Sequence, residues 1–227
     1  MGSLVEDRRL RDKRYVFADR RDAGKLLSGN LLKYKGTDAL ILAIPSGGVP
    51  VATEIAKAID RPMDLIIVRK LQIPFNPEAG FGAMGPDGEV ILNEMLLSQL
   101  TLTGEAINVV IRATEKVIRK RNEIFRRGKS FPQCKDKCVI IVDDGLASGF
   151  TMLAAIRFIK RLEPSRVVVA VPTASERTLE AILPEVDELL CLNVRTGFSF
   201  AVADAYRNWY DLTDREVLSI LENRNDT

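Results

Sequence analysis

Residues 139–151 constrain the fold of this chain more than any other segment, because a buried strand, a polar loop and a helix follow one another there. The four residues Val-Ile-Ile-Val are apolar and β-branched, which predicts a strand covered on both faces. Asp143 and Asp144 end this strand, at the edge where open parallel sheets bind ligands. The segment therefore predicts an α/β fold with a ligand site beside these two acids.

The loop after the acids is suited to a phosphate group. It comprises Gly145, Leu146, Ala147, Ser148, Gly149, Phe150 and Thr151. Its backbone N–H groups, its two hydroxyls and the positive end of the following helix favour an anion. The carboxylates repel a phosphate and suit a diol or a hydrated metal ion instead. The two parts together indicate a site for a phosphorylated ribose; the alternative is an ordinary buried strand that ends in a solvated acidic turn.

Strand and helix patterns alternate along the rest of the chain. Strands are predicted at 39–44, 64–69, 90–92, 138–142, 166–171 and 188–194, and helices at 23–34, 49–59, 105–127, 151–162, 176–183 and 214–222. This alternation favours a mostly parallel sheet with helices on both faces. A Pro-Asp-Gly turn between 81–84 and 89–92 predicts a small antiparallel hairpin. We expect one domain over residues 1–227, with residues 1–18 as an N-terminal extension.

Composition excludes several classes of protein. The formal net charge is only +2, so a dedicated nucleic-acid binder is not expected. The chain has no histidine, which removes Ser-His-Asp catalysis, His-ligated metals and imidazole acid–base chemistry. Three scattered cysteines suit a reducing cytoplasm. No apolar run is as long as a membrane span, and the N-terminus is too charged for a signal peptide, so we expect a cytoplasmic protein with no membrane partner.

The segment 139–151 closely resembles the signature of type I phosphoribosyltransferases, which bind 5-phosphoribosyl-1-pyrophosphate (PRPP). The paired acids, the small residue Ala147, Ser148-Gly149 and Thr151 are in register with that signature. The resemblance implies the fold of this family, with a small hairpin or lid and a C-terminal hood. It also implies that residues 147–151 hold the 5-phosphate and that the two acids lie by the ribose hydroxyls. Mg²⁺ would be held at Asp143 and Asp144 through water or PRPP.

Two further segments match the pyrophosphate end of such a site. A strand at 39–44 leads into Ser46, Gly47 and Gly48, where the family has its pyrophosphate loop, although many relatives carry a basic residue in place of Ser46. Adjacent glycines let the backbone approach a ligand closely, or simply make a tight turn. Arg69 and Lys70 end the next predicted strand, where basic residues of the family face the pyrophosphate, so they are expected to neutralise charge on the leaving group.

Residues 71–83 contain two prolines and two glycines and are predicted to form a loop, at the place of the family's mobile lid. Glu78 is its single carboxylate, and we hypothesise that it positions or deprotonates the acceptor. The long helix over residues 104–129 is rich in Lys and Arg, with i,i+4 pairs expected at Glu115–Arg119 and Glu123–Arg127. It is either a surface or interface helix or an attractor for a polyanion.

Residues 194–224 combine aromatic residues with a predicted C-terminal helix. They can form the hood over a nucleobase, with Asp204 and Tyr206 at a base edge and Phe198 or Phe200 stacked on it, or they can close the core. Hypoxanthine–guanine enzymes have an aspartate where this chain has Ala147, so the acceptor is not assigned. The chain resembles a branch of predicted phosphoribosyltransferases with the pattern Pro-x-Gly-Gly-Val-Pro, Val-Arg-Lys-Leu and Asn-Pro-Glu.

The resemblance implies a Mg²⁺-dependent enzyme, expected to be a homodimer. It would transfer the phosphoribosyl group of PRPP to a nitrogenous, nucleobase-like acceptor and release pyrophosphate. A non-catalytic PRPP-sensing regulator that binds RNA, DNA or a protein partner is the first alternative, and the basic helix is its best feature. An interaction module without a site is the second, and the intact segment 143–151 argues against it.

Overall fold

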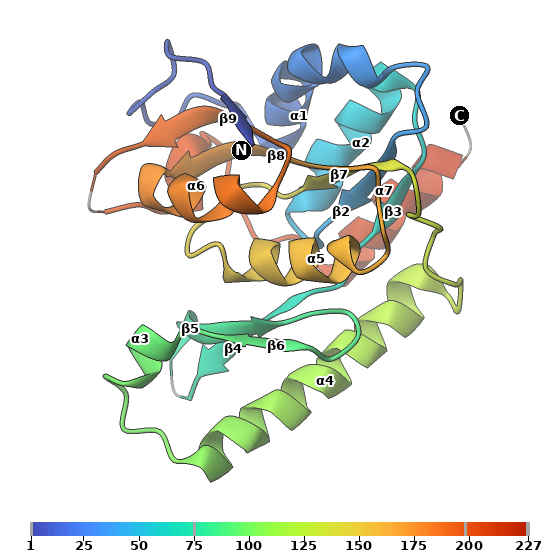
Figure 1. The fold of residues 1–227 in the computed structure, drawn as a ribbon. Coiled ribbons are helices and arrows are strands. Elements are labelled where there is room, and N and C mark those ends of the chain that lie inside the picture. The colour runs from blue at the N-terminus through green and yellow to red at the C-terminus, as the bar shows by residue number, and fades with distance from the viewer. Residues whose placement is uncertain (1, 75, 198, 226–227) are drawn as a thin grey trace.

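The computed structural model describes residues 2–74, 76–197 and 199–225 and contains a central parallel sheet (Figure 1). Its six strands are β1 (Ser3–Val5), β2 (Leu40–Ala43), β3 (Met63–Leu65), β7 (Cys138–Val142), β8 (Arg166–Ser175) and β9 (Glu188–Arg195). They lie in the order β1-β9-β8-β7-β2-β3, and every neighbouring pair is parallel. The predicted mostly parallel sheet is thus confirmed.

Helices cover both faces of this sheet (Figure 1). One face carries α1 (Arg20–Ser28), the 3-10 helix η1 (Gly29–Tyr34), α2 (Gly48–Ile59) and α7 (Asp214–Asn225); the other carries α5 (Phe150–Lys160) and α6 (Glu176–Ile182). Successive side chains of β7 point to opposite faces, and Val139 and Ile140 are both fully buried, one in each hydrophobic cluster. Such double burial explains the continuous apolar run of this strand. The helices predicted at 49–59, 105–127 and 151–162 are confirmed to within two residues.

A smaller antiparallel sheet lies between α5 and the long helix α4 (Figure 1). It comprises β4 (Arg69–Ile73), β5 (Asn76–Met84) and β6 (Val90–Leu92), and it is followed by α3 (Glu94–Leu97) and α4 (Gly104–Arg126). The predicted hairpin is confirmed as the β5–β6 pair. The predicted loop over 71–83 is wrong, because it falls mostly within β4 and β5. Its glycines serve strand pairing: a Cβ at Gly82 would overlap the backbone oxygen of Ile91.

The predicted N-terminal extension contributes a strand to the main sheet and contacts the carboxyl end of β9. β1 forms the edge strand beside β9. Asn193, which is fully buried, donates through Nδ2 to the backbone oxygens of Leu10 (2.5 Å) and Lys13 (3.1 Å). Phe17 forms a parallel bridge with Tyr206. Residues 10–17 therefore pack against the carboxyl end of β9 and against residues 204–207. Within the described residues, no helix is both long and apolar enough to cross a membrane.

Candidate functional site

The two predicted acids lie directly after β7, which is flanked by β8 and β2 near the middle of the sheet. Both side chains are partly buried, and the backbone N–H of Asp144 donates to Oδ1 of Asp143 (2.8 Å). Burial, and then the negative charge of Asp144, raise the pKa of Asp143 well above its usual range. Adjacent carboxylates in this position favour a ligand that brings hydrogen-bond donors or positive charge.

Arg20, a residue that the sequence analysis missed, supplies a counter-charge to this pair. Its Nε donates to Oδ2 of Asp144 (2.7 Å), and only 8% of its side chain is exposed. Its Nη1 donates to the backbone oxygen of Tyr210 (2.8 Å), while its guanidinium lies 3.8 Å from the ring centroid of Trp209. Arg20 and Asp144 are 124 positions apart, so no local sequence pattern could have indicated this contact.

The loop predicted to bind phosphate runs from the acids into the first turn of α5. Gly149 has φ +79°, in the left-handed region that favours glycine, and α5 starts at the next residue without a side-chain cap. Ala147 and Ser148 are exposed, and the backbone oxygen of Ala147 accepts from Oγ1 of Thr178 (2.6 Å). The first N–H groups of a helix have no partner inside that helix. The loop therefore ends in helix N–H groups of the kind that bind anions, and its phosphate-binding role stays a prediction.

The glycine loop at residues 46–48 packs directly against the acids. It follows β2, which is paired with β7, so the two loops leave neighbouring strands at the same edge. The peptide between Pro45 and Ser46 is cis. A Cβ at Gly47 would overlap the carboxylate of Asp144, and a Cβ at Gly48 would lie 2.6 Å from the backbone oxygen of Val142. The structure therefore brings together the two loops that the sequence singled out separately.

Arg69 and Lys70 are placed differently from the prediction. β3 ends at Leu65, whereas Arg69 and Lys70 begin β4 of the small sheet, so they do not end a strand of the parallel sheet. Burial, and then the positive charge of Arg121, lower the pKa of Arg69, while Asp214 acts in the opposite direction. Arg69 therefore has charged neighbours on α4 and α7. The strand prediction was wrong because β3 ends at Leu65, although the apolar run continues through Val68 to the start of β4.

The side chain of Glu78 lies outside the described part of the structure, as does Phe198, so their predicted roles stay predictions. Tyr206 is 1% exposed, and its hydroxyl donates to the backbone oxygen of Asp144 (2.5 Å). The prediction that this residue contacts a base edge is therefore wrong, because its ring is buried and its hydroxyl is bonded to the backbone of Asp144. Asp204 lies 3.7 Å from the guanidinium of Arg14.

The buried hydroxyl of Tyr206 predicts a measurable pH dependence. Burial, and then the charge of Asp144, raise the pKa of Tyr206 well above its usual value, so the folded protein keeps a proton that the unfolded chain loses near pH 10. The free energy of unfolding should therefore fall by about 1.4 kcal/mol per pH unit above about pH 10 through this residue. Urea unfolding at about pH 9 and about pH 11 should show Tyr206→Phe losing less stability than the unmodified protein. An equal loss in both proteins would contradict this assignment.

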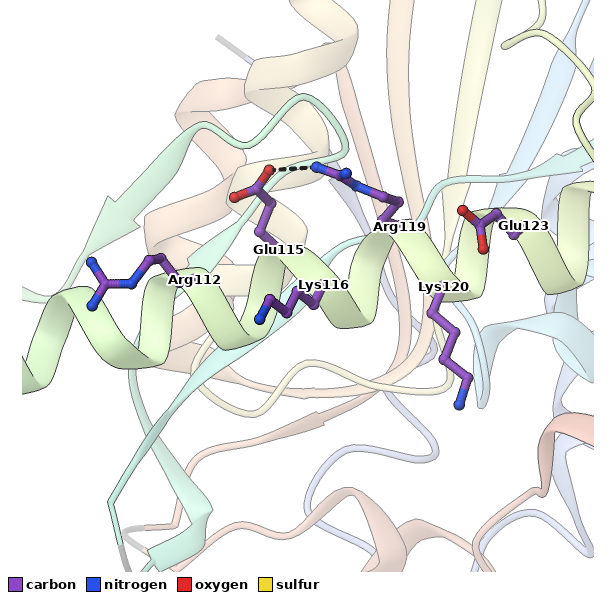
Figure 2. Close-up of a pocket in the computed structure, with 6 residues that line it drawn as sticks. All are labelled: Arg112, Glu115, Lys116, Arg119, Lys120 and Glu123. Carbon is purple, nitrogen blue, oxygen red and sulfur yellow. Dashed lines mark hydrogen bonds and ion pairs between the residues drawn. The ribbon is translucent and has the colours of Figure 1, made fainter.

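The charged face of α4 is separate from these loops. Figure 2 shows Arg112, Lys116 and Lys120 along the helix, with the predicted pair Glu115–Arg119 confirmed at 3.0 Å. The predicted pair Glu123–Arg127 is replaced, because α4 ends at Arg126 and the guanidinium of Arg127, whose φ is +49°, contacts Glu222. Charges of both signs alternate on this face, which is typical of a solvated helix.

Comparisons with known proteins agree with this geometry. The phosphoribosyl transferase domain family matches residues 18–206. Two proteins of Mycobacterium tuberculosis (strains CDC 1551 and H37Rv), each named "Putative phosphoribosyl transferase", are 38% identical to this chain over 207 residues, which are 91% of this chain. The match covers 46% of each relative, so the chain spans about half their length.

Solved structures share the fold. The crystal structure of the protein TT1426 from Thermus thermophilus has a TM-score of 0.72 and 36% identity, and the match covers 91% of this chain and 98% of that one. The AQ2163 protein from Aquifex aeolicus has a TM-score of 0.50 and 16% identity over 82% of this chain and 78% of that one, which supports the fold alone. The chain belongs to the phosphoribosyl transferase domain family, a family of pentosyltransferases.

Proposed function

We propose that this domain binds Mg²⁺-PRPP and transfers its phosphoribosyl group to a nitrogenous base, with release of pyrophosphate. One observation carries the proposal: Gly47, in the loop assigned to pyrophosphate, packs against Asp144, the acid assigned to the ribose. The residues assigned to the 5-phosphate, 147–151, belong to the loop that starts directly after Asp144. This packing supports adjoining sites for the three parts of PRPP along one edge of the sheet.

The acids fit a hydrated Mg²⁺ ion that is shared with the substrate. Among the described residues, no group of three or more His, Cys, Asp or Glu side chains could hold a metal. Mg²⁺ is commonly bound by one or two carboxylates together with substrate phosphates, which is the donor set that Asp143, Asp144 and PRPP would provide. When bound, the ion would offset negative charge on the pyrophosphate leaving group.

The protein's own contribution would be to position the substrate and to stabilise charge. The acids accept hydrogen bonds from the ribose hydroxyls, which fixes the sugar ring relative to the leaving group. Backbone N–H groups of 147–151 hold the 5-phosphate, and those of 46–48 hold the pyrophosphate. We also propose, on the family resemblance, that Arg69 and Lys70 offset negative charge on the pyrophosphate. The homodimer, the cytoplasmic location and the nucleobase class of acceptor rest on the same resemblance.

Calorimetric titration with Mg²⁺-PRPP tests this function. We expect saturable binding, and ligand at about a hundred times its dissociation constant should add about 2.7 kcal/mol to the free energy of unfolding. Thermal melting with and without PRPP provides a second measurement of this stabilisation by the ligand. The absence of binding by the folded protein would contradict the proposal.

A pyrophosphate-release assay then separates a transferase from a PRPP sensor. The PRPP-bound protein is supplied with purine and pyrimidine bases, and release that depends on a base supports transfer. PRPP binding without release for any base would favour the regulator, for which the cations of α4, among them Lys116 and Lys120, offer a surface (Figure 2).

A further inference from the structure

Arg20 is a buried cation whose side chain is held on three sides. It is the first residue of α1, and the start of this helix is fixed by Asp19, whose carboxylate accepts from the backbone N–H of Asp22 (2.9 Å). The guanidinium donates to Asp144 and to the backbone oxygen of Tyr210, and one of its faces lies against the ring of Trp209. A planar guanidinium can satisfy two acceptors in its plane and an aromatic ring on its face, whereas a lysine ammonium cannot.

The contact with Arg20 fixes the orientation of the carboxylate that the proposed function places at the ribose. Oδ2 of Asp144 accepts from Arg20, and the same oxygen is the one that a Cβ at Gly47 would overlap. The backbone oxygen of Asp144 is held in turn by the hydroxyl of Tyr206. Asp144 is therefore restrained by groups from three separate parts of the chain, and rotation of its carboxylate would break the contact with Arg20.

Residues 206–210 contact Asp144 both directly and through Arg20. The ring centroids of Tyr206 and Trp209 are 5.2 Å apart, so the two aromatic residues form one unit. Tyr206 reaches the backbone of Asp144 directly, and Trp209 reaches its side chain through Arg20. Trp209 is 36% exposed, so this unit extends from the surface of the protein to the acid.

We propose that Arg20 is the positioning residue of the ribose site: clamped by Trp209 and Tyr210, it holds the Asp144 carboxylate in the orientation that accepts a ribose hydroxyl. This inference rests on the proposed function. An ion pair that only tied α1 to the sheet would change stability and leave ligand affinity unaltered. A positioning residue must instead change affinity for ligands that contain the sugar, and spare those that lack it.

Replacement of Arg20 by methionine tests the inference, with Arg21→Met as the matched control. Arg21 is the next residue of α1, but 54% of its side chain is exposed and its ion pair with Glu54 is 3.5 Å long. We expect Arg20→Met to bind Mg²⁺-PRPP about 10-fold to 100-fold more weakly, because hydrogen bonds to charged groups contribute that much to affinity. Binding of pyrophosphate without Mg²⁺, which has neither the sugar nor the ion proposed at the acids, should change by less than about 2-fold. Arg21→Met should likewise leave the binding of both ligands within about 2-fold.

The possible results separate the inference from the proposed function. If the unmodified protein binds no PRPP, the proposed function fails, and this inference fails with it. If the unmodified protein binds PRPP and a folded Arg20→Met variant binds it equally well, only the inference is overturned. Equal weakening of PRPP and pyrophosphate binding would also overturn it, because the effect would then not be specific to the sugar. Arg20→Lys should recover only part of the affinity, since it keeps the charge but loses the planar contacts.

Trp209 allows a test that does not depend on the folding of any variant. It is the only tryptophan of the chain, so its fluorescence reports on the ring beside Arg20. Titration of the unmodified protein with Mg²⁺-PRPP should change this emission with the dissociation constant that calorimetry gives, and pyrophosphate without Mg²⁺ should change it less. Constant emission while calorimetry shows PRPP binding would contradict the coupling of Asp144, Arg20 and Trp209.

Discussion

Gly47→Ala is expected to remove most PRPP binding and to destabilise the protein at the same time. The backbone of Gly47 has φ −61° and ψ −36°, which alanine adopts readily, so the effect does not come from backbone strain. It comes from the added Cβ, which would overlap the Asp144 carboxylate. Displacing this group breaks its contact with Arg20 and moves the proposed ribose acceptor. Overpacking of this kind typically costs about 1–3 kcal/mol of stability.

Two measurements check this prediction. Urea unfolding gives the loss of stability, and calorimetry should show Mg²⁺-PRPP affinity reduced at least about 100-fold, because misplaced catalytic geometry has effects of that order. Gly29→Ala is the matched control: its φ of −56° is also ordinary, and no heavy atom lies within 4 Å of the added Cβ. It should bind PRPP normally and be about as stable as the unmodified protein, or up to about 1 kcal/mol more stable. Normal PRPP binding by Gly47→Ala would contradict the packing of the two loops.

The double substitution Asp143→Asn/Asp144→Asn should abolish Mg²⁺-PRPP binding while leaving the fold intact. The amides cannot attract a metal ion as carboxylates do, so the affinity should fall at least about 100-fold. Calorimetry measures this loss directly. In melting experiments, the stabilisation of about 2.7 kcal/mol expected at a hundredfold excess of PRPP over its dissociation constant should disappear.

The stability of the double variant without ligand follows from two opposing effects. Loss of the Asp144 charge leaves the buried guanidinium of Arg20 without its ion pair, which destabilises the folded state. Asp143, however, has a raised pKa, so its ionisation above the unfolded pKa opposes folding, and asparagine removes that cost. We therefore expect only a small net change. Asp60→Asn is a suitable control, because Asp60 has φ +52°, which asparagine tolerates. Retained PRPP binding by the double variant would rule out the assigned site.

Local patterns predicted the elements that carry the site with little error. The strand predicted at 138–142 is β7, and the helices after both loops start within one residue of their predicted positions. The sequence predicts these elements because a strand buried on both faces and an amphipathic helix each have a characteristic order of apolar residues over a short segment. The small sheet was predicted less well from the sequence. The Gly and Pro content of 71–83 is typical of a loop, but Gly82 allows close approach of β6, which only the paired structure reveals.

The sequence by itself determined the α/β class, the acids at the end of a doubly buried strand and the two glycine-containing loops. Each of these features follows from the residue pattern of short, continuous segments. Only the tertiary structure decided what surrounds those acids. Arg20 and Tyr206 lie 124 and 62 positions from Asp144, and Gly47 reaches it because β2 and β7 are neighbours in the sheet. Contacts between segments so far apart depend on strand order and packing, which no short stretch of sequence records.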